Sequence, residues 1–164
     1  MTIGAEAFRD ALRHFPAGVT LVTLRAAGVR HGLTVSAFAS VSPEPPLVAV
    51  MIDHKHRAHE LLERPDAVFA VNVLAEDQRA LSDRFAWSEE EDRFAAGRWT
   101  VAATGAPVLE DAVAWLDCTI FSRHAAGTHS LYIGRVEASA VPRPEAPPLV
   151  YWNRDYRRLD LPPA

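Results

Sequence analysis

The sequence predicts a mainly-β protein in which an antiparallel barrel is decorated by short helices. Twelve prolines in 164 residues, several of them in pairs, exclude long uninterrupted helices and mark turns and strand entries. Runs rich in β-branched residues alternate with short amphipathic stretches in the order helix, strands, helix, strand, helix, strands. This order does not fit a repeating βαβ parallel sheet. The length suits one domain spanning residues 1–164.

Three short helices are expected. The first carries an apolar face, ends at Pro16 and should cover the body of the protein. That face consists of Phe8, Ala11, Leu12 and Phe15. A second helix is expected within residues 53–64, and a third within 76–86, where two acids suit a helix N-terminus. The more acidic stretch 88–97 is expected to form a lid-like helix or loop.

The expected strands are short runs of β-branched and apolar residues bounded by turn residues. They are residues 18–24, 33–38, 46–52, 67–74, 112–121, 129–141 and 148–152. The first two flank Gly28 and should form a hairpin, and residues 122–127 should connect the two long late strands. Segment 46–52 is apolar on both faces, as a strand enclosed in a barrel would be. Together these runs predict the barrel.

Composition excludes several classes of partner. A net charge of −4 and a pI near 6.0, without any basic tract, argue against nucleic acid or an anionic membrane surface. Cys118 is the only cysteine, which indicates a reducing, cytoplasmic setting, and no signal segment or membrane-length apolar run is seen. The G-x-G-x-x-G, G-x-x-x-x-G-K-[ST] and G-x-S-x-G motifs are all missing. A nucleotide cofactor would therefore need another binding geometry.

Hydroxyl residues alternate with small apolar residues just before segment 46–52. The candidate binding residues in this run are Thr34, Val35, Ser36, Ala37, Ser40, Val41 and Ser42. Hydroxyls and backbone N–H groups at a strand end can bind phosphate oxygens or the edge of a heteroaromatic ring. An ordinary half-exposed strand would show the same spacing. The spacing alone does not decide between the two.

A basic turn follows segment 46–52. Its members are His54, Lys55, His56, Arg57 and His59. No metal site is expected, because His54 and His56 would lie about 200° apart on a helix and no cysteine or carboxylate set assists them. A solvated turn and an anion site both remain open. In the second case Lys55 and Arg57 are the expected phosphate contacts.

Two further sets of residues are candidates. His129 opens a late strand between Gly127 and Gly134, where a flat ligand could approach the backbone, although a lone histidine is more often simply packed or solvated. The tail "PLVYWNRDYRRL" supplies four candidates that could close over a site, pack on a second subunit or dock the C-terminus. These are Tyr151, Trp152, Tyr156 and Arg157.

Read together, these segments resemble the flavin reductase-like family, NAD(P)H:flavin oxidoreductases with an FMN-binding split β-barrel. The resemblance covers Phe8 to Leu159, and its motifs occur in the order of the family. The matching segments are 32–52, 69–86, 92–118, 127–138 and 148–159.

The resemblance implies what each candidate does. Residues 34–42 would wrap the isoalloxazine and ribityl phosphate of FMN or FAD, and His54, Lys55 and Arg57 would reach the phosphate. Tyr156 joins the expected flavin contacts. His129 would act in catalysis near the nicotinamide of NADH or NADPH. A homodimer is expected, which would pass reduced flavin to a partner flavin-dependent monooxygenase.

Two departures from the family pattern keep an alternative open. The family often has Ser-Arg-Thr at the phosphate turn, where this chain has His56-Arg57-Ala58. The family's Gly-Asp-His becomes Gly127-Thr128-His129, so the acid is missing. The alternative is a flavin-binding or flavin-carrier split-barrel protein without significant reductase activity.

Overall fold

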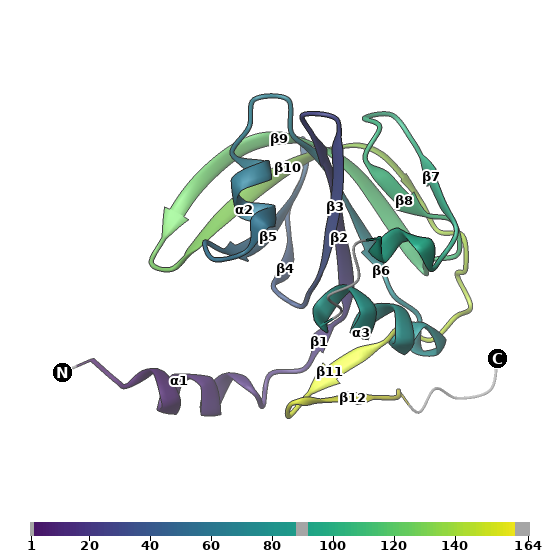
Figure 1. The fold of residues 1–164 in the computed structure, drawn as a ribbon. Coiled ribbons are helices and arrows are strands. Elements are labelled where there is room, and N and C mark those ends of the chain that lie inside the picture. The colour runs from purple at the N-terminus through teal and green to yellow at the C-terminus, as the bar shows by residue number, and fades with distance from the viewer. Residues whose placement is uncertain (1, 88–91, 160–164) are drawn as a thin grey trace.

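A seven-stranded antiparallel sheet forms the body of the protein (Figure 1). The structure, a computed structural model, describes residues 2–87 and 92–159. The strands run in the order β3-β2-β6-β9-β10-β5-β4. Their bounds are β2 (Thr20–Ala26), β3 (Val29–Val35), β4 (Phe38–Pro43), β5 (Pro46–Asp53), β6 (Val68–Val73), β9 (Ala114–Ala126) and β10 (His129–Ala140). The predicted mainly-β antiparallel architecture is confirmed.

The two edge strands of this sheet, β3 and β4, are joined by Ser36 and Ala37 alone. A connection this short spans at most about 10 Å, so the sheet must curl until its edges approach one another at that end. The backbone N–H of Met51 on β5 donates to the Ala37 carbonyl, 3.1 Å away. The predicted single strand 33–38 is therefore wrong. The chain breaks there because it passes from one edge of the sheet to the other.

Two hairpins show how local sequence sets the strand ends. Ala27 and Gly28 both have positive φ (50° and 75°), the geometry of a tight two-residue turn between β2 and β3. Gly127 and Thr128 turn the chain from β9 into β10, so residues 122–126 prolong β9 and do not connect it to β10 as predicted. Residues 127–128 thus lie at the tip of a long hairpin.

The main core lies inside the curled sheet and beneath helix α2 (Arg57–Leu62). Ala58, Leu61 and Leu62 are buried, and the helix lies within residues 53–64, where one was expected. The helix therefore closes one opening of the barrel. Within the barrel, Gly134 lets β10 pass close to a neighbouring side chain, because a Cβ there would overlap the Phe69 ring.

A second core lies on the other side of β2 and β3, under the third helix. It is built around the rings of Phe85, Phe94 and Trp99, whose centroids lie 5.0–5.6 Å apart. The elements are η1 (Glu76–Gln78), α3 (Arg79–Trp87), η2 (Arg93–Ala95), β7 (Trp99–Val101) and β8 (Pro107–Leu109). Strands β7 and β8 were not predicted. Of the acidic stretch 88–97, residues 88–91 lie outside the described residues and 93–95 form the short 3-10 helix η2.

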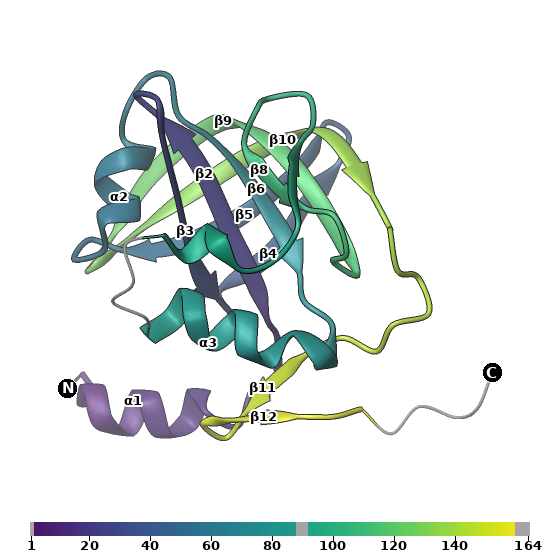
Figure 2. The same cartoon turned by 45° about the vertical axis from the view of Figure 1, so that its right-hand side comes forward.

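The C-terminal segment returns to this second core through a small sheet. Its strands are β1 (Ala17–Gly18), β11 (Val150–Trp152) and β12 (Asp155–Arg157), with β11 in the middle. The predicted strand 148–152 corresponds to β11, and β12 was not predicted. Figure 2 shows this sheet beneath α3, so the tail lies beside the end of β3.

The first helix, α1 (Ala5–Leu12), stands away from the barrel (Figures 1 and 2). None of its residues is buried. Phe8 and Leu12 are both 52% exposed and Phe15 is 73% exposed. The prediction that this apolar face covers the protein's own body is wrong, because no surface of the described chain lies beneath it.

Candidate functional site

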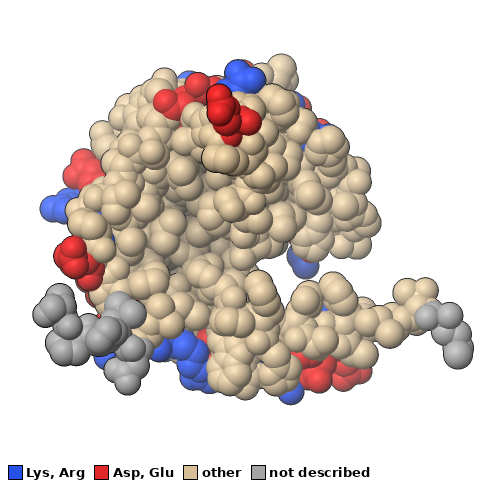
Figure 3. Space-filling model, turned by 180° about the vertical axis from the view of Figure 1, so that it is seen from behind, with Lys and Arg blue, Asp and Glu red and all other residues tan. Residues whose placement is uncertain are grey.

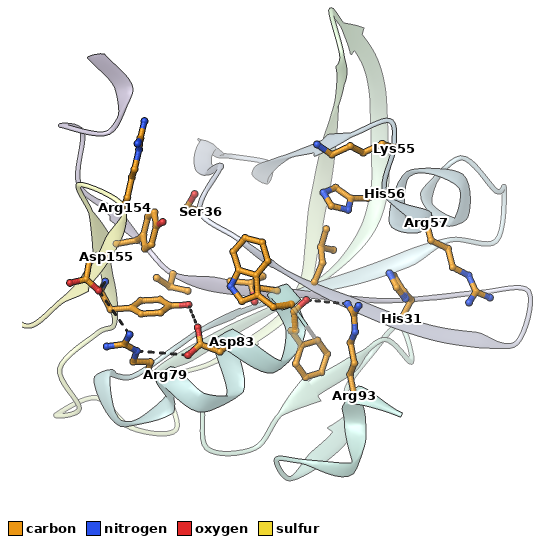
Figure 4. A pocket seen from close by; sticks show the side chains of 18 residues that line it. His31, Ser36, Lys55, His56, Arg57, Arg79, Asp83, Arg93, Arg154 and Asp155 are labelled. Atoms are coloured by element: carbon orange, nitrogen blue, oxygen red, sulfur yellow. Dashed lines mark hydrogen bonds and ion pairs between the residues drawn. The ribbon is translucent and has the colours of Figure 1, made fainter. Parts of the chain in front are cut away.

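A cavity of about 740 Å³ opens where the end of β3, the turn before α2, helix α3 and the C-terminal segment meet (Figure 4). Five cationic side chains and two carboxylates line it, a formal charge of +3 with histidine neutral. They are Lys55, Arg57, Arg79, Arg93, Arg154, Asp83 and Asp155. The whole chain carries −4. Positive charge is therefore concentrated here, which favours an anionic ligand.

One end of the cavity is largely neutralised. Arg79 lies 3.8 Å from Asp83 and 3.9 Å from Asp155, and its guanidinium stacks over the Tyr156 ring at 4.8 Å. Figure 4 shows this group together with Arg154 on the side of the C-terminal segment. Arg79 pairs with both carboxylates, and Asp83 and Asp155 together offset the formal charge of Arg79 and Arg154, so this end attracts an anion less strongly.

The opposite end, beside α2, keeps its positive charge. Lys55 pairs with Asp53 at 3.1 Å. In the described parts of the chain, no ion pair or hydrogen bond engages the guanidinium of Arg57. Arg93 donates to the carbonyl oxygens of Phe85 and Gly32 at 3.1 and 3.4 Å, and these bonds position its guanidinium at this end. This end has the character of a phosphate site.

The pKa of His31 reflects the positive electrostatic potential at that end. Its pKa falls from 6.5 to about 4, first because the ring is buried and then because Arg93, Arg57 and His56 carry or can acquire positive charge nearby. The imidazole is therefore neutral at pH 7 and can both donate and accept a hydrogen bond.

The hydroxyl residues at the end of β3 divide into two roles. Thr34 Oγ1 donates to the Ser82 carbonyl at 2.6 Å and so holds α3 against β3. The Ser36 side chain lines the cavity. The Tyr156 hydroxyl donates to Asp83 Oδ1 at 3.0 Å and lies 2.8 Å from Ser82 Oγ, which fastens the C-terminal segment to α3. Burial, more than any other cause, raises the pKa of Tyr156.

Residues 12–160 match the family described as "flavin reductase like domain". The chain belongs to the flavin reductase-like family. This match spans most of the chain and includes every candidate residue named above, and the split-barrel fold predicted from the resemblance is confirmed.

Three similar proteins illustrate the range of the family. The reductase component of the FADH2-dependent resorcinol hydroxylase of Rhizobium sp. strain MTP-10005 is 42% identical over 153 residues, 91% of this chain and 84% of that protein. The actinorhodin polyketide dimerase of Streptomyces coelicolor is 41% identical over 152 residues, 92% and 84% of the two chains. The solved structure of the NADH:FAD oxidoreductase SgcE6 of Streptomyces globisporus C-1027, with NAD and FAD fragments, has a TM-score of 0.86 at 29% identity and covers 97% of this chain and 96% of that one.

The cavity brings together five of the flavin contacts expected from the resemblance to the flavin reductase-like family. These are Thr34, Ser36, Lys55, Arg57 and Tyr156. Val35 is 6% exposed and packs in the core with Ala37 beside it. Ser40, Val41 and Ser42 lie on the edge strand β4, outside the cavity lining, and Ser42 Oγ lies 3.2 Å from the Glu44 N–H that it accepts. The flavin roles of all these residues, inside and outside the cavity lining, remain predictions.

His129 lies at the start of β10, opposite Asp53 of β5. Its Nδ1 is 2.9 Å from Thr128 Oγ1, the hydroxyl that stands where the family has an acid. The backbone N–H of His54 donates to the Thr128 carbonyl at 3.0 Å. The hairpin tip and the basic turn are therefore fixed to one another, although His129 does not line the cavity. Its catalytic role remains a prediction.

A polar network fixes α2, which follows the basic turn, to β10. His59 Nδ1 lies 2.6 Å from the Tyr132 hydroxyl, and that hydroxyl donates to Glu63 Oε1 at 2.7 Å. Tyr132 has one proton to give, so His59 Nδ1 must carry the proton of the first bond. His54 Nε2 lies 3.1 Å from Ser130 Oγ, and its ring is 4.5 Å from that of His59. His54 therefore connects the basic turn to β10 and to α2.

Six charged or titratable residues of the cavity were not predicted from the sequence. They are His31, Arg79, Asp83, Arg93, Arg154 and Asp155. They come from β3, α3, η2 and the tail, and no spacing rule links them. One weak signal was available, because all of them except His31 lie within segments that carried the family resemblance, namely 69–86, 92–118 and 148–159.

No group of three or more His, Cys, Asp or Glu side chains is arranged to hold a metal ion in residues 2–87 and 92–159. Over the same ranges, every helix is too short or too polar to cross a membrane.

Proposed function

We propose that this protein is an NAD(P)H-dependent flavin reductase that reduces FMN or FAD. The observation that carries the proposal is the cavity of about 740 Å³ with a formal charge of +3, placed at the end of β3 in a chain of the flavin reductase-like family. A flavin offers a planar ring and a phosphate. The cavity offers strand-end backbone and hydroxyl groups at Ser36 and a cationic end at Arg57, so the donor set fits that ligand.

The chain's own residues would bind and orient the reactants. When bound, the nicotinamide and the flavin would themselves supply the hydride-transfer chemistry, which needs no protein nucleophile. Lys55 and Arg57 would hold the flavin phosphate. Backbone N–H groups around Val35 to Ala37 would stabilise negative charge on the ring, and His129 would orient the nicotinamide.

The reduced flavin would leave for a separate flavin-dependent monooxygenase. The 42% identical protein from Rhizobium is named as the reductase component of such a system, which supports this proposal. We place the reaction in the cytoplasm. Support comes from Cys118, which is buried and has no partner for an intrachain disulfide, and burial raises the pKa of its thiol to about 12.

We also propose a homodimer. The exposed apolar face of α1 has no cover within residues 2–87 and 92–159 of its own chain, as the 52% exposure of Phe8 shows. Figure 3 shows a face of the molecule whose centre carries few charged side chains, with Asp, Glu, Lys and Arg gathered toward its margins. A second copy that covers both surfaces would bury this apolar area.

The decisive assay follows NADH and NADPH oxidation at 340 nm with FMN, with FAD and without added flavin. Oxidation that depends on flavin supports the proposal. Tight flavin binding in a fluorescence titration without oxidation of either nucleotide supports the alternative, a flavin-binding or carrier protein. The replacement of the family's acid by Thr128 is the observation that favours this alternative.

A further inference from the structure

A second groove, of about 580 Å³, adjoins the candidate flavin cavity. Three residues, His31, Arg57 and Arg93, line both spaces. Figure 4 shows these three side chains together at one end of the cavity. A ligand whose phosphate lies at Arg57 therefore has a continuous path out of the cavity and into the groove.

The groove is cationic. Arg30, Arg57 and Arg93 line it, against a single carboxylate, Asp92, in the described part of its lining. His31, half-buried at the joint between the two spaces, has its pKa lowered to about 4 by desolvation and then by the positive charge of Arg93 and Arg57. The positive potential therefore extends along the path and is not confined to the cavity.

Arg30 is held over the groove with donors to spare. Its guanidinium stacks over the Phe94 ring at 4.8 Å, and its Nη2 lies 3.2 Å from Asp92 Oδ1 and 3.3 Å from Oδ2. Both contacts use Nη2. Nε and Nη1 have no partner among the described residues, so they are available to bind an anion. Asp92 is itself fixed by the Phe94 N–H at 3.1 Å. A preorganised guanidinium of this kind suits a phosphate.

We propose that this groove binds the second phosphate and the adenosine of FAD, and that the chain therefore prefers FAD to FMN. The inference rests on the proposed function, with the first flavin phosphate at Arg57. FMN ends at that phosphate. FAD continues through one P–O–P link, which brings its second phosphate to the shared rim and within the field of Arg30 and Arg93.

The diphosphate of the pyridine nucleotide is the less fitting occupant. Its nicotinamide must stack on the flavin ring, which the proposed function places at the Ser36 end of the cavity. The groove begins beyond Arg57, on the side of the flavin phosphate. A diphosphate that continues from that point is the flavin's own.

Arg30→Gln tests the proposal because Arg30 lines the groove and not the cavity. Arg98→Gln is the matched control, since Arg98 is also exposed, also pairs with one carboxylate (Glu110, 3.9 Å) and lines neither space. Equilibrium titrations with FAD and FMN need no turnover. We expect the wild type to prefer FAD, and Arg30→Gln to weaken FAD binding about tenfold or more, the loss of one charged hydrogen bond, with FMN affinity changed less than about twofold.

Arg98→Gln should behave as the wild type, and Arg30→Lys should keep part of the preference. Equal losses for FAD and FMN, or a wild type that binds both alike, would overturn the proposal. So would a rise in KM for NADPH alone, which would assign the groove to the pyridine nucleotide. Flavin-dependent NADH oxidation with no FAD preference would refute this inference and spare the proposed function. FAD-selective binding without oxidation of NADH or NADPH would support this inference and refute the proposed function.

Discussion

His59 Nδ1 lies 2.6 Å from the Tyr132 hydroxyl oxygen, and this contact joins helix α2 to strand β10 of the main sheet. The same hydroxyl donates to Glu63 at 2.7 Å. The helix begins at Arg57, so its first turn carries Arg57 and His59 of the basic turn. A bond made in the core therefore holds the proposed phosphate-binding turn in place.

Tyr132→Phe should remove this support. Tyr132 is fully buried and His59 is half-buried, so the variant leaves His59 Nδ1 without its partner, and we expect the free energy of unfolding to fall by about 1–3 kcal/mol. Urea unfolding measures it. Tyr151→Phe is the control, because Tyr151 is 37% exposed. Equal stability of the two variants would show that the network contributes little.

Arg57→Ala should weaken flavin affinity by about 1–3 kcal/mol, the range for loss of a hydrogen bond to a charged group. The residue is exposed and has no ion-pair partner in the described chain, so folding should be unaffected. Fluorescence titration with FMN and FAD gives the affinity. Arg64→Ala, which removes an arginine that pairs with Asp66 at 3.8 Å outside the cavity, is the control. Unchanged affinity would remove Arg57 from the site.

His129→Ala should slow hydride transfer while flavin affinity stays largely intact. The residue lies at the hairpin tip, outside the cavity lining, and the proposed role concerns only the nicotinamide. Stopped-flow reduction of bound flavin by NADH separates the rate of transfer from binding. A parallel loss of flavin affinity would instead make His129 a flavin ligand.

His31 should make stability depend on pH. Its pKa is about 4 in the folded chain and 6.5 in the unfolded chain, so the unfolded state binds the extra proton between these values. Stability contributed by the neutral ring is thus fully present above pH 6.5 and is lost as the pH falls toward 4. The slope from this residue reaches at most about 1.4 kcal/mol per pH unit. Burial of the ring is the largest cause of the lowered pKa, and the positive charge of Arg93, Arg57 and His56 lowers it further.

Denaturant unfolding at pH 7 and pH 5 measures this dependence, with His31→Gln as the comparison. The variant should lose less stability than the wild type between the two values. Identical losses would mean that His31 does not titrate abnormally. A bound phosphate should raise the pKa of His31, so excess flavin should reduce the pH dependence of the wild type.

Leu12→Glu should disrupt the proposed homodimer, because it places a charge in the exposed apolar face of α1 where a second copy would bury it. Sedimentation velocity distinguishes monomer from dimer. Glu6→Lys, a charge change elsewhere on the same helix, is the control. A wild type that sediments as a monomer at all concentrations would refute the dimer directly.

Local sequence was sufficient to predict the strand-rich, antiparallel character of the chain and most of its strands. Alternation of apolar and polar residues, β-branched composition and the Ala27–Gly28 turn act over a few residues and can be read directly. The family resemblance added the split barrel and the flavin roles expected of five residues that line the cavity. It depended on segments that lie in order along the chain.

Only the tertiary structure decided how the cavity is charged. His31, Arg79 and Arg93 come from β3, α3 and η2, and which of them is neutralised depends on contacts such as Arg79 with Asp155, 76 positions away. The break of strand 33–38 at Ser36 and Ala37 likewise follows from the closure of a seven-stranded sheet. The sequence by itself determined the local pattern and the family. Closure of the sheet, which sets distances between residues far apart in the chain, determined the site.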